Sequence, residues 1–182
     1  MNIPSTLDGY TIVALAPEAV AALSGVQKLG LPENMEYLMF TTADLPATVN
    51  ALDIVGTNSK FMVDNGVLYS KDENNNAKVL LVYPKAKVAK TFTVPDTVTE
   101  IGYRAFCDTT KLETLIVPSV VTVRDQAFEN AKISTINFTN TAASTFAGRD
   151  ILLGANDKIV INVKVMPNVL IDYSVIQKFE IA

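Results

Sequence analysis

The stretch "VPDTVTEIGYRAFCDTTKLETLIVPSVVTVRDQAF", residues 94–128, contains the same pattern twice. A Val-Pro pair stands at position 94 and again at 117, and an Ala-Phe pair stands at position 105 and again at 127. A fixed period of about 20 to 50 residues is typical of proteins built from stacked structural repeats. The chain is therefore expected to hold further copies of this unit.

The apolar positions of the unit recur in four segments. They are Ile12, Leu15, Val20, Val26, Leu29 and Leu31 in the first segment, Met35, Leu38, Ala43, Val49, Leu52 and Ile54 in the second, Val98, Ile101, Phe106, Leu112, Leu115 and Val117 in the third, and Val120, Val123, Phe128, Ile133, Ile136 and Phe138 in the fourth. One unit alone cannot bury its apolar side, so stacking several units is the physical reason for the period. The pattern predicts a repeat solenoid, mostly β with short turns or helices.

Each unit is expected to contribute one strand. In "LETLIV" the alternation predicts that Leu115 and Val117 point inward and Ile116 outward. Proline follows directly at position 118, and it ends the hydrogen-bonded pairing because it has no N–H to donate. The rest of the unit should turn back to the start of the next strand.

Residues 55–93 interrupt the period and are predicted to form an inserted β-meander. Asn65-Gly66 lies between two apolar segments and is a strong hairpin signal, because both central residues of a type I′ turn need a positive φ. A polar loop, "KDENNN" at 71–76, and a third strand follow before the repeat resumes at "FTVP".

We interpret the chain as one leucine-rich-repeat domain, with repeats at about 3–54 and 94–138 and the meander at 55–93 between them. Ile3-Pro4 already stands at a strand end, which leaves no N-terminal cap in the sequence. After residue 138 the pattern fades into alternation over 159–165 and one possible short helix and final strand. Repeat arrays need atypical end units, so 139–182 is assigned to a C-terminal cap.

"VPDTVTEIGYRAF" and "LETLIVP" resemble the BspA-like leucine-rich repeat, I-P-x-x-V-x-x-I-G-x-x-A-F followed by L-x-x-I-x-I-P. The opening, the inserted hairpin and the closing "VKVMPNVLIDY" are also similar to members of this family, so the resemblance covers nearly the whole chain. It implies a right-handed leucine-rich-repeat-type β/α solenoid with one parallel sheet. It also implies a cell-surface or secreted bacterial protein that takes part in adhesion.

The sequence departs from the family pattern at core positions. Thr109 stands where the family usually has cysteine, and Cys107 is displaced from that place. Val20 and Ala43 replace the phenylalanine in the first two units, which predicts leaner packing there.

The composition of the chain limits the kinds of partner that it is expected to bind. Fifteen Lys and Arg against nineteen Asp and Glu give a net charge of −4, whereas nucleic-acid binding needs clustered positive charge. Charge or proline interrupts every apolar stretch before it reaches the ~18 to 20 residues that span a bilayer, so no membrane insertion is expected. The N-terminus shows no signal-peptide pattern, which fits either an internal protein or a mature or trimmed form.

Catalytic equipment is sparse, and no cofactor or metal is predicted. The chain has no histidine, which removes the usual triads and the commonest zinc ligand, and it has no phosphate-binding glycine motif. Cys107, beside Phe106, is interpreted as core packing rather than as a nucleophile. A pair of catalytic carboxylates stays possible, because any two of nineteen acids can converge in space.

Three further patterns each have an ordinary and a functional interpretation. Residues 71–76 are favoured as a solvated turn over a calcium loop. The basic strip of Lys85, Lys87 and Lys90 is favoured as a solubilising edge over a site for an acidic partner. The N-glycosylation pattern that begins at Asn137 is favoured as chance.

The outward side of the repeat strands remains as the candidate binding surface, because solenoids commonly bind partners there. Its tentative ligand-binding residues are Lys28, Asp53, Thr114, Ile116, Thr135 and Asn137. The favoured function is a non-catalytic adhesion module that recognises a protein or polysaccharide through this face or the inserted hairpin. The alternatives are a structural spacer or intracellular scaffold in a larger protein and, more distantly, a carboxylate-based glycosidase.

Overall fold

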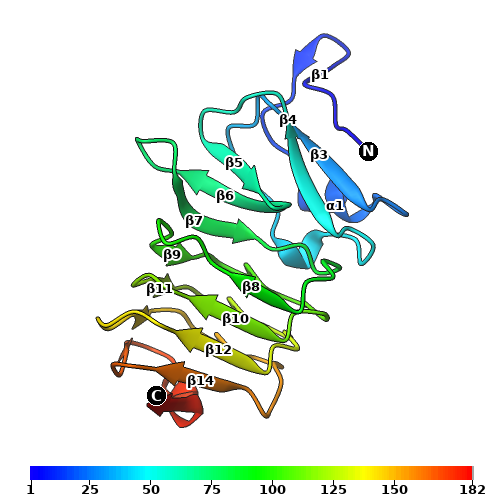
Figure 1. Cartoon of the computed structure of the whole chain (residues 1–182). Helices are drawn as coiled ribbons and strands as arrows, with labels where there is room; N and C mark the ends of the chain where they lie inside the picture. Colours follow the sequence, from blue (N-terminus) through cyan, green and yellow to red (C-terminus); the bar gives the residue numbers. More distant parts are fainter. Residues whose placement is uncertain (182) are drawn as a thin grey trace.

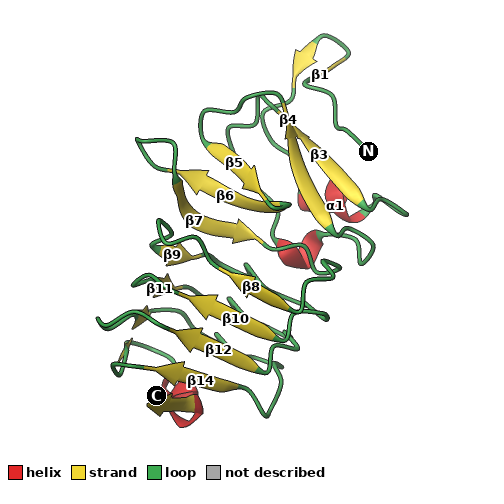
Figure 2. Ribbon diagram, viewed as in Figure 1, coloured by secondary structure: helices red, strands yellow, loops and turns green. Residues whose placement is uncertain are grey.

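The computed structural model describes residues 1–181, and strands stacked along one axis dominate it (Figure 1 and Figure 2). A five-stranded parallel sheet has the order β16-β14-β12-β10-β8, and a seven-stranded sheet has the order β15-β13-β11-β9-β7-β6-β5. The first sheet consists of β8 (Thr91–Thr93), β10 (Thr114–Val117), β12 (Thr135–Phe138), β14 (Val160–Val163) and β16 (Phe179–Ile181). The second consists of β5 (Phe61–Asp64), β6 (Val67–Lys71), β7 (Ala77–Val82), β9 (Glu100–Ile101), β11 (Thr122–Val123), β13 (Thr145–Phe146) and β15 (Asn168–Val169).

The N-terminal end is built from smaller elements. They are the antiparallel pair β1 (Thr6–Leu7) and β2 (Tyr10–Thr11), the helix α1 (Pro17–Ala21), the parallel pair β3 (Lys28–Pro32) and β4 (Ala51–Val55), and the 3-10 turn η1 (Thr42–Asp44). A second 3-10 helix, η2 (Tyr173–Lys178), lies near the other end. The two chain termini lie at opposite ends of the stack (Figure 1).

From β8 onward each coil of the chain places one strand in each sheet. Register partners are Phe92, Leu115 and Ile136 in the five-stranded sheet and Ile101, Val123 and Phe146 in the seven-stranded sheet. One strand per repeat in one parallel sheet was expected from the sequence, and this expectation was wrong. The segment that returns to the next strand is long enough to pair with its neighbours as well.

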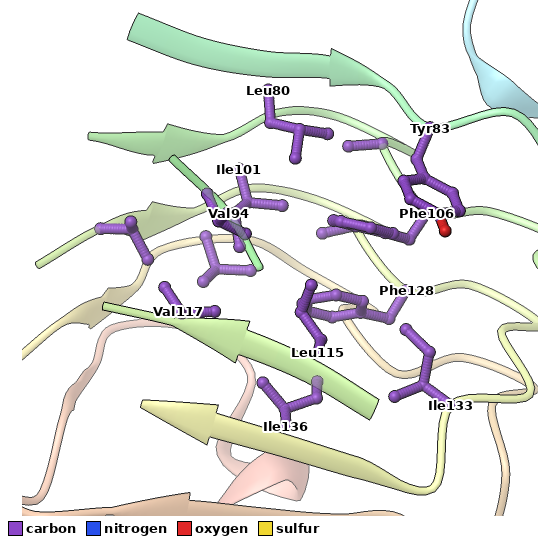
Figure 3. Close-up of a cluster of buried hydrophobic side chains, with 14 of the residues drawn as sticks. Leu80, Tyr83, Val94, Ile101, Phe106, Leu115, Val117, Phe128, Ile133 and Ile136 are labelled. Atoms are coloured by element: carbon purple, nitrogen blue, oxygen red, sulfur yellow. The ribbon is translucent and has the colours of Figure 1, made fainter. Parts of the chain in front are cut away.

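The space between the two sheets holds the larger buried cluster, here called the repeat core. Leu115 and Val117 are fully buried and Ile116 is only half-buried, as the alternation predicted. Figure 3 shows Phe106 and Phe128 from consecutive coils lying over one another, beside Leu115 and Ile136. Each coil thus covers the apolar side of the one before it, which confirms a repeat solenoid.

Tight turns with positive φ follow the strands β9, β11 and β13 of the seven-stranded sheet. They fall four residues apart in three successive coils, at Arg104 and Asp108, Gln126 and Asn130, and Asp150 and Gly154. In the third of these coils a Cβ on Gly154 would lie 2.1 Å from Asn130 Oδ1, so a side chain there would require the Asn130 side chain to move. These turns take the place of the helix expected from a β/α repeat.

The first two units form a separate small stack. Leu29 of β3 lies beside Leu52 of β4 in parallel register, and both belong to a second buried cluster, here called the N-terminal core. Residues 1–3 pair with β3 as an additional extended segment, since Ile3 N donates to Gly30 O at 2.8 Å. The predicted rungs therefore line up as two groups of neighbours in two cores rather than in one continuous row.

The inserted meander separates and joins these two cores. The hairpin forms at Asn65-Gly66 with both φ angles positive, and β7 then pairs in parallel with β9. Tyr69 and Leu80 enter the repeat core, whereas Leu68 and Val82 enter the N-terminal core. The meander is therefore buried on both faces.

Short polar contacts reinforce this junction. Thr42 Oγ1 donates to Ala105 O at 2.7 Å, and Leu52 N donates to Gly66 O at 2.9 Å. Ala86 N donates to Val49 O at 3.3 Å. These hydrogen bonds, one from a side-chain hydroxyl and two between main-chain groups, fix the N-terminal stack against the meander and the first repeat coil.

Two expectations within the repeat need correction. Val120, expected inward, is 44% exposed, and Val121 is buried in its place, because 121 lies exactly one period after Val98. In the segment assigned to a cap, 139–182, β13 to β16 extend both sheets past Phe138. The step from Ile136 to its partner Ile161 is 25 residues, and this longer loop hides the coil from a fixed-period search.

Candidate binding surface

The outward face of the five-stranded sheet presents two columns of side chains. The first runs through Thr91, Thr114, Thr135 and Val160, and the second through Thr93, Ile116, Asn137 and Asn162. These residues are half-buried or exposed, whereas their chain neighbours Leu115 and Ile136 are fully buried. Alternation along each strand therefore separates a core face from a solvent face.

Hydroxyl and amide groups dominate the two columns. Asn162 Nδ2 donates to Asn137 Oδ1 at 2.7 Å, so the amides of adjacent strands are aligned. Beyond the strand starts, Lys90 and Glu113 form an exposed ion pair at 2.8 Å. The face is largely polar and its backbone is held by the sheet, so its side chains can donate and accept hydrogen bonds without moving the backbone.

Four of the six predicted residues, Thr114, Ile116, Thr135 and Asn137, lie together on this face. Lys28 and Asp53 lie on the separate β3–β4 sheet, where Lys28 Nζ contacts Asp53 Oδ2 at 2.7 Å. The hydrogen bond from Lys28 lowers the pKa of Asp53. The two groups share a face but are engaged with each other.

The residues that β8 and β14 contribute to this face were not predicted from the sequence. Thr93 precedes Val94-Pro95 just as Ile116 precedes Val117-Pro118, so the recurring Val-Pro pair was a usable signal for it. Asn162 had no such marker, because no proline follows β14 directly.

The lysines of the basic strip contact other groups of the same chain. Lys85 Nζ donates to Ala43 O at 2.8 Å and lies 3.7 Å from Asp108. Lys87 Nζ donates to Asn65 O at 2.5 Å, and Lys90 pairs with Glu113. These contacts tie loops together, a role that differs from both the solubilising edge and the acidic-partner site considered for the strip.

In the polar loop at 71–76, the Asp72 carboxylate is hydrogen-bonded within the loop itself. Asp72 Oδ1 accepts hydrogen bonds from Asn74 N and Asn76 N, both at 2.8 Å, and these bonds lower the pKa of Asp72. Within residues 1–181 no group of three or more His, Cys, Asp or Glu side chains is arranged to hold a metal ion. The arrangement matches the solvated turn favoured from the sequence.

Cys107 is buried against Glu129, whose Oε2 lies 3.6 Å from its sulfur. Burial, with smaller contributions from Asp108 and Glu129, raises the pKa of the thiol to about 12. A nucleophilic cysteine needs the opposite shift, so this environment favours a packing role.

Two carboxylates of the repeat coils are paired with arginines. Glu100 pairs with Arg124 at 2.6 Å and Glu129 pairs with Arg104 at 2.8 Å. The pKa values of Asp53 and Asp72 are lowered, whereas the acid of a glycosidase needs a raised pKa. None of these groups is prepared for carboxylate-based hydrolysis.

Comparison with known proteins identifies the repeat. Residues 84–148 match a family model described as "BspA type Leucine rich repeat region (6 copies)". No curated protein matches the chain. No helix within residues 1–181 has the length and apolar character needed to cross a membrane.

Solved structures of bacterial leucine-rich repeat proteins share the fold. The pneumococcal vaccine antigen PcpA is 17% identical with a TM-score of 0.61, over 88% of this chain and 49% of that one. A leucine rich cell surface protein from Faecalibacterium prausnitzii is 17% identical with a TM-score of 0.57, over 76% and 42%. A leucine-rich repeat protein from Eubacterium ventriosum is 20% identical with a TM-score of 0.54, over 75% and 42%. The chain thus spans about half the length of these proteins or less.

Proposed function

We propose that this chain, whose residues 84–148 match the model of the BspA-type leucine-rich repeat, is a non-catalytic binding module. Its partner is a protein or polysaccharide that lies on the outward face of the five-stranded sheet. The observation that carries the proposal is the pair of polar columns that continues across β8, β10, β12 and β14. A rigid, solvent-facing sheet surface of this kind is what solenoid proteins use to bind partners.

The proposed location is the cell surface or the extracellular medium of a bacterium. The names of two structural neighbours, a vaccine antigen and a cell surface protein, support this placement. Treating intact cells of the source organism with protease, followed by detection with a specific antibody, tests it. Loss of the signal before lysis is expected, and full protection until lysis would instead favour the intracellular scaffold.

Binding is tested with the purified chain and panels of extracellular-matrix proteins and glycans. A double variant, Thr114→Arg with Asn137→Arg, places two bulky charges on the proposed face without touching the core. It should weaken capture of the partner about tenfold or more, a loss of roughly 1.4 kcal/mol. Circular dichroism confirms that the variant is folded.

The matched control is Glu73→Arg with Asn74→Arg, on the exposed turn of the inserted meander. It should bind like the unchanged protein. If this variant loses the partner and the sheet variant keeps it, recognition belongs to the meander. If both panels stay silent and the protein is internal, a structural spacer is the better account.

A further inference from the structure

A second surface feature lies on the turns that follow β9 and β11, away from the polar columns (Figure 1). Tyr103 is 49% exposed there. Among the side chains described between residues 84 and 172, it is the only aromatic ring that is exposed. A tyrosine side chain presents an apolar ring face and a polar hydroxyl, a combination that suits contact with a partly polar ligand.

Packing does not require a tyrosine at this place. The equivalent positions in the next two coils are held by Asp125 and Arg149, as the hydrogen bonds from Arg104 N to Asp125 O and from Gln126 N to Arg149 O show. The same turn is therefore built with an aspartate and with an arginine. The ring of Tyr103 is an addition to the repeat rather than part of its core.

The ring is held in position. The Arg104 guanidinium carbon lies 5.4 Å from the centroid of the Tyr103 ring, within the range of a cation–π contact. Arg104 is itself fixed by Glu129 at 2.8 Å and by Gln126 at 3.0 Å. One face of the ring is covered by the arginine, and the exposed part is left for a ligand.

Polar groups surround the ring in a shallow depression lined by Glu100, Tyr103, Arg124, Asp125 and Ala147. Arg124 Nη2 contacts Glu100 Oε2 at 2.6 Å, which orients both side chains. Asp125 Oδ1 accepts a hydrogen bond from Arg149 N at 2.8 Å, so this carboxylate is also anchored. The depression therefore combines an aromatic wall with donors and acceptors in fixed places.

The lining of the depression carries two carboxylates, Glu100 and Asp125, and one arginine, Arg124. Arg124 is paired with Glu100, and Arg104 with Glu129. The excess of carboxylates disfavours an anionic ligand, whereas a neutral ligand rich in hydroxyls can bond to both members of the Arg124–Glu100 pair at once.

We propose that this depression is a subsite for a neutral, β-linked hexose unit, stacked by its C–H face on Tyr103 and hydrogen-bonded to Arg124, Glu100 and Asp125. A β-linked hexose with equatorial hydroxyls has an apolar ring face and a polar rim, the same division that the depression shows. The inference rests on the proposed binding function and names a saccharide class for a second surface of the module.

The test is titration of the whole chain with cellohexaose and with N-acetylchitohexaose, followed by amide chemical shifts in a two-dimensional NMR spectrum. At least one hexasaccharide should shift the amides around Tyr103 and Arg124 at concentrations below about 10 mM. The variant Tyr103→Ala should weaken this binding about tenfold or more, and Tyr103→Phe should keep it because the ring remains. Tyr37→Ala is the matched control, since Tyr37 is also exposed and lies beneath a cation, Lys60.

The subsite is overturned if neither hexasaccharide shifts those amides, or if Tyr103→Ala binds as tightly as the unchanged chain. Capture of a partner that is lost in the Thr114→Arg, Asn137→Arg variant but kept in Tyr103→Ala, with no hexasaccharide response, rejects the subsite and leaves the proposed function standing. Hexasaccharide binding that Tyr103→Ala abolishes and Thr114→Arg, Asn137→Arg leaves intact supports the subsite.

Discussion

The rings of Phe106 and Phe128 stack with their centroids 5.4 Å apart and their planes 23° from parallel. They come from consecutive coils, and both are fully buried. Phe106 also lies 5.1 Å from the ring of Tyr83, which connects the repeat to the end of the meander. This aromatic column is where two coils and the insertion meet.

Removing one ring from this aromatic column should lower the stability of the fold. Phe106→Ala is expected to lower the free energy of unfolding by about 3 to 5 kcal/mol, because it removes a buried ring and leaves a cavity between coils that cannot collapse. Urea unfolding followed by circular dichroism measures the loss. Phe106→Leu, which keeps much of the volume, should cost clearly less, and equal losses for the two variants would show that the cavity is not the cause.

High pH should destabilise the fold through Tyr83. Burial raises the pKa of Tyr83 to about 12 from its ordinary value of 10.0. The folded state therefore keeps a proton that the unfolded state has lost, and the free energy of unfolding falls as pH rises from about 10 to about 12. Below about pH 10 this contribution is fully present. Urea midpoints measured at pH 8, 10 and 11 should decrease in that order.

The variant Tyr83→Phe separates this effect from other alkaline changes. The hydroxyls of Tyr83 and Tyr69 have no hydrogen-bond partner among residues 1–181. Removing the Tyr83 hydroxyl should thus leave stability at pH 7 unchanged or raise it by up to about 1 kcal/mol, since a buried unpaired polar group is lost. The decrease above pH 10 should become smaller, and an unchanged pH profile would contradict the assignment to Tyr83.

Cys107 should resist alkylation in the native protein. Its thiol is buried and its raised pKa leaves almost no thiolate near neutral pH. Labelling with iodoacetamide at pH 8 is expected to be roughly a hundredfold slower than in urea-unfolded protein. Because the chain has one cysteine, mass spectrometry reports this site alone. Rapid native labelling would point to local opening of the coil around Cys107.

Asn58 should be a stability determinant despite its place in a loop. Its Nδ2 donates to Glu33 O and Met35 O, both at 2.7 Å, and its Oδ1 accepts from Lys60 N and Phe61 N, both at 2.8 Å. Asn58→Ala removes all four bonds and leaves partly buried main-chain groups unpaired. A loss of about 3 to 5 kcal/mol in unfolding free energy is expected by urea titration.

A matched variant sets the scale for that loss. Asn140 makes one hydrogen bond, from Nδ2 to Ser119 O at 2.9 Å, and is half-buried. Asn140→Ala should cost about 0.5 to 1.5 kcal/mol. Similar losses for the two asparagines would mean that the loop at Asn58 rearranges to satisfy its own main chain.

The sequence predicts the inward residues of the repeat well because their spacing follows from a physical requirement. Leu115, Ile136 and Phe128 must face the neighbouring coil, so each falls at a fixed offset from the Val-Pro pair or the Ala-Phe pair. The hairpin at Asn65-Gly66 was equally readable, because its positive φ angles restrict the residue types.

Other features could not be read because they depend on loop length or on distant partners. The last coils were missed when the loop before Ile161 lengthened, since turns outside the core are free to vary. The short strands β9 and β11 consist of two residues each, which is too little for a periodic pattern. The position of Tyr103 beside Arg124 follows only from the stacking of two coils.

In an ordinary repeat array each unit touches only its neighbours, so an end unit can open while the middle stays intact. Here the meander shares its two faces between the cores, with Leu68 on one side and Tyr69 on the other. Detaching the meander would expose the repeat core and the N-terminal core to water at the same time. The molecule should therefore unfold as one cooperative unit instead of fraying coil by coil. The β3–β4 pair at its N-terminal end should stabilise the repeat coils that follow the meander.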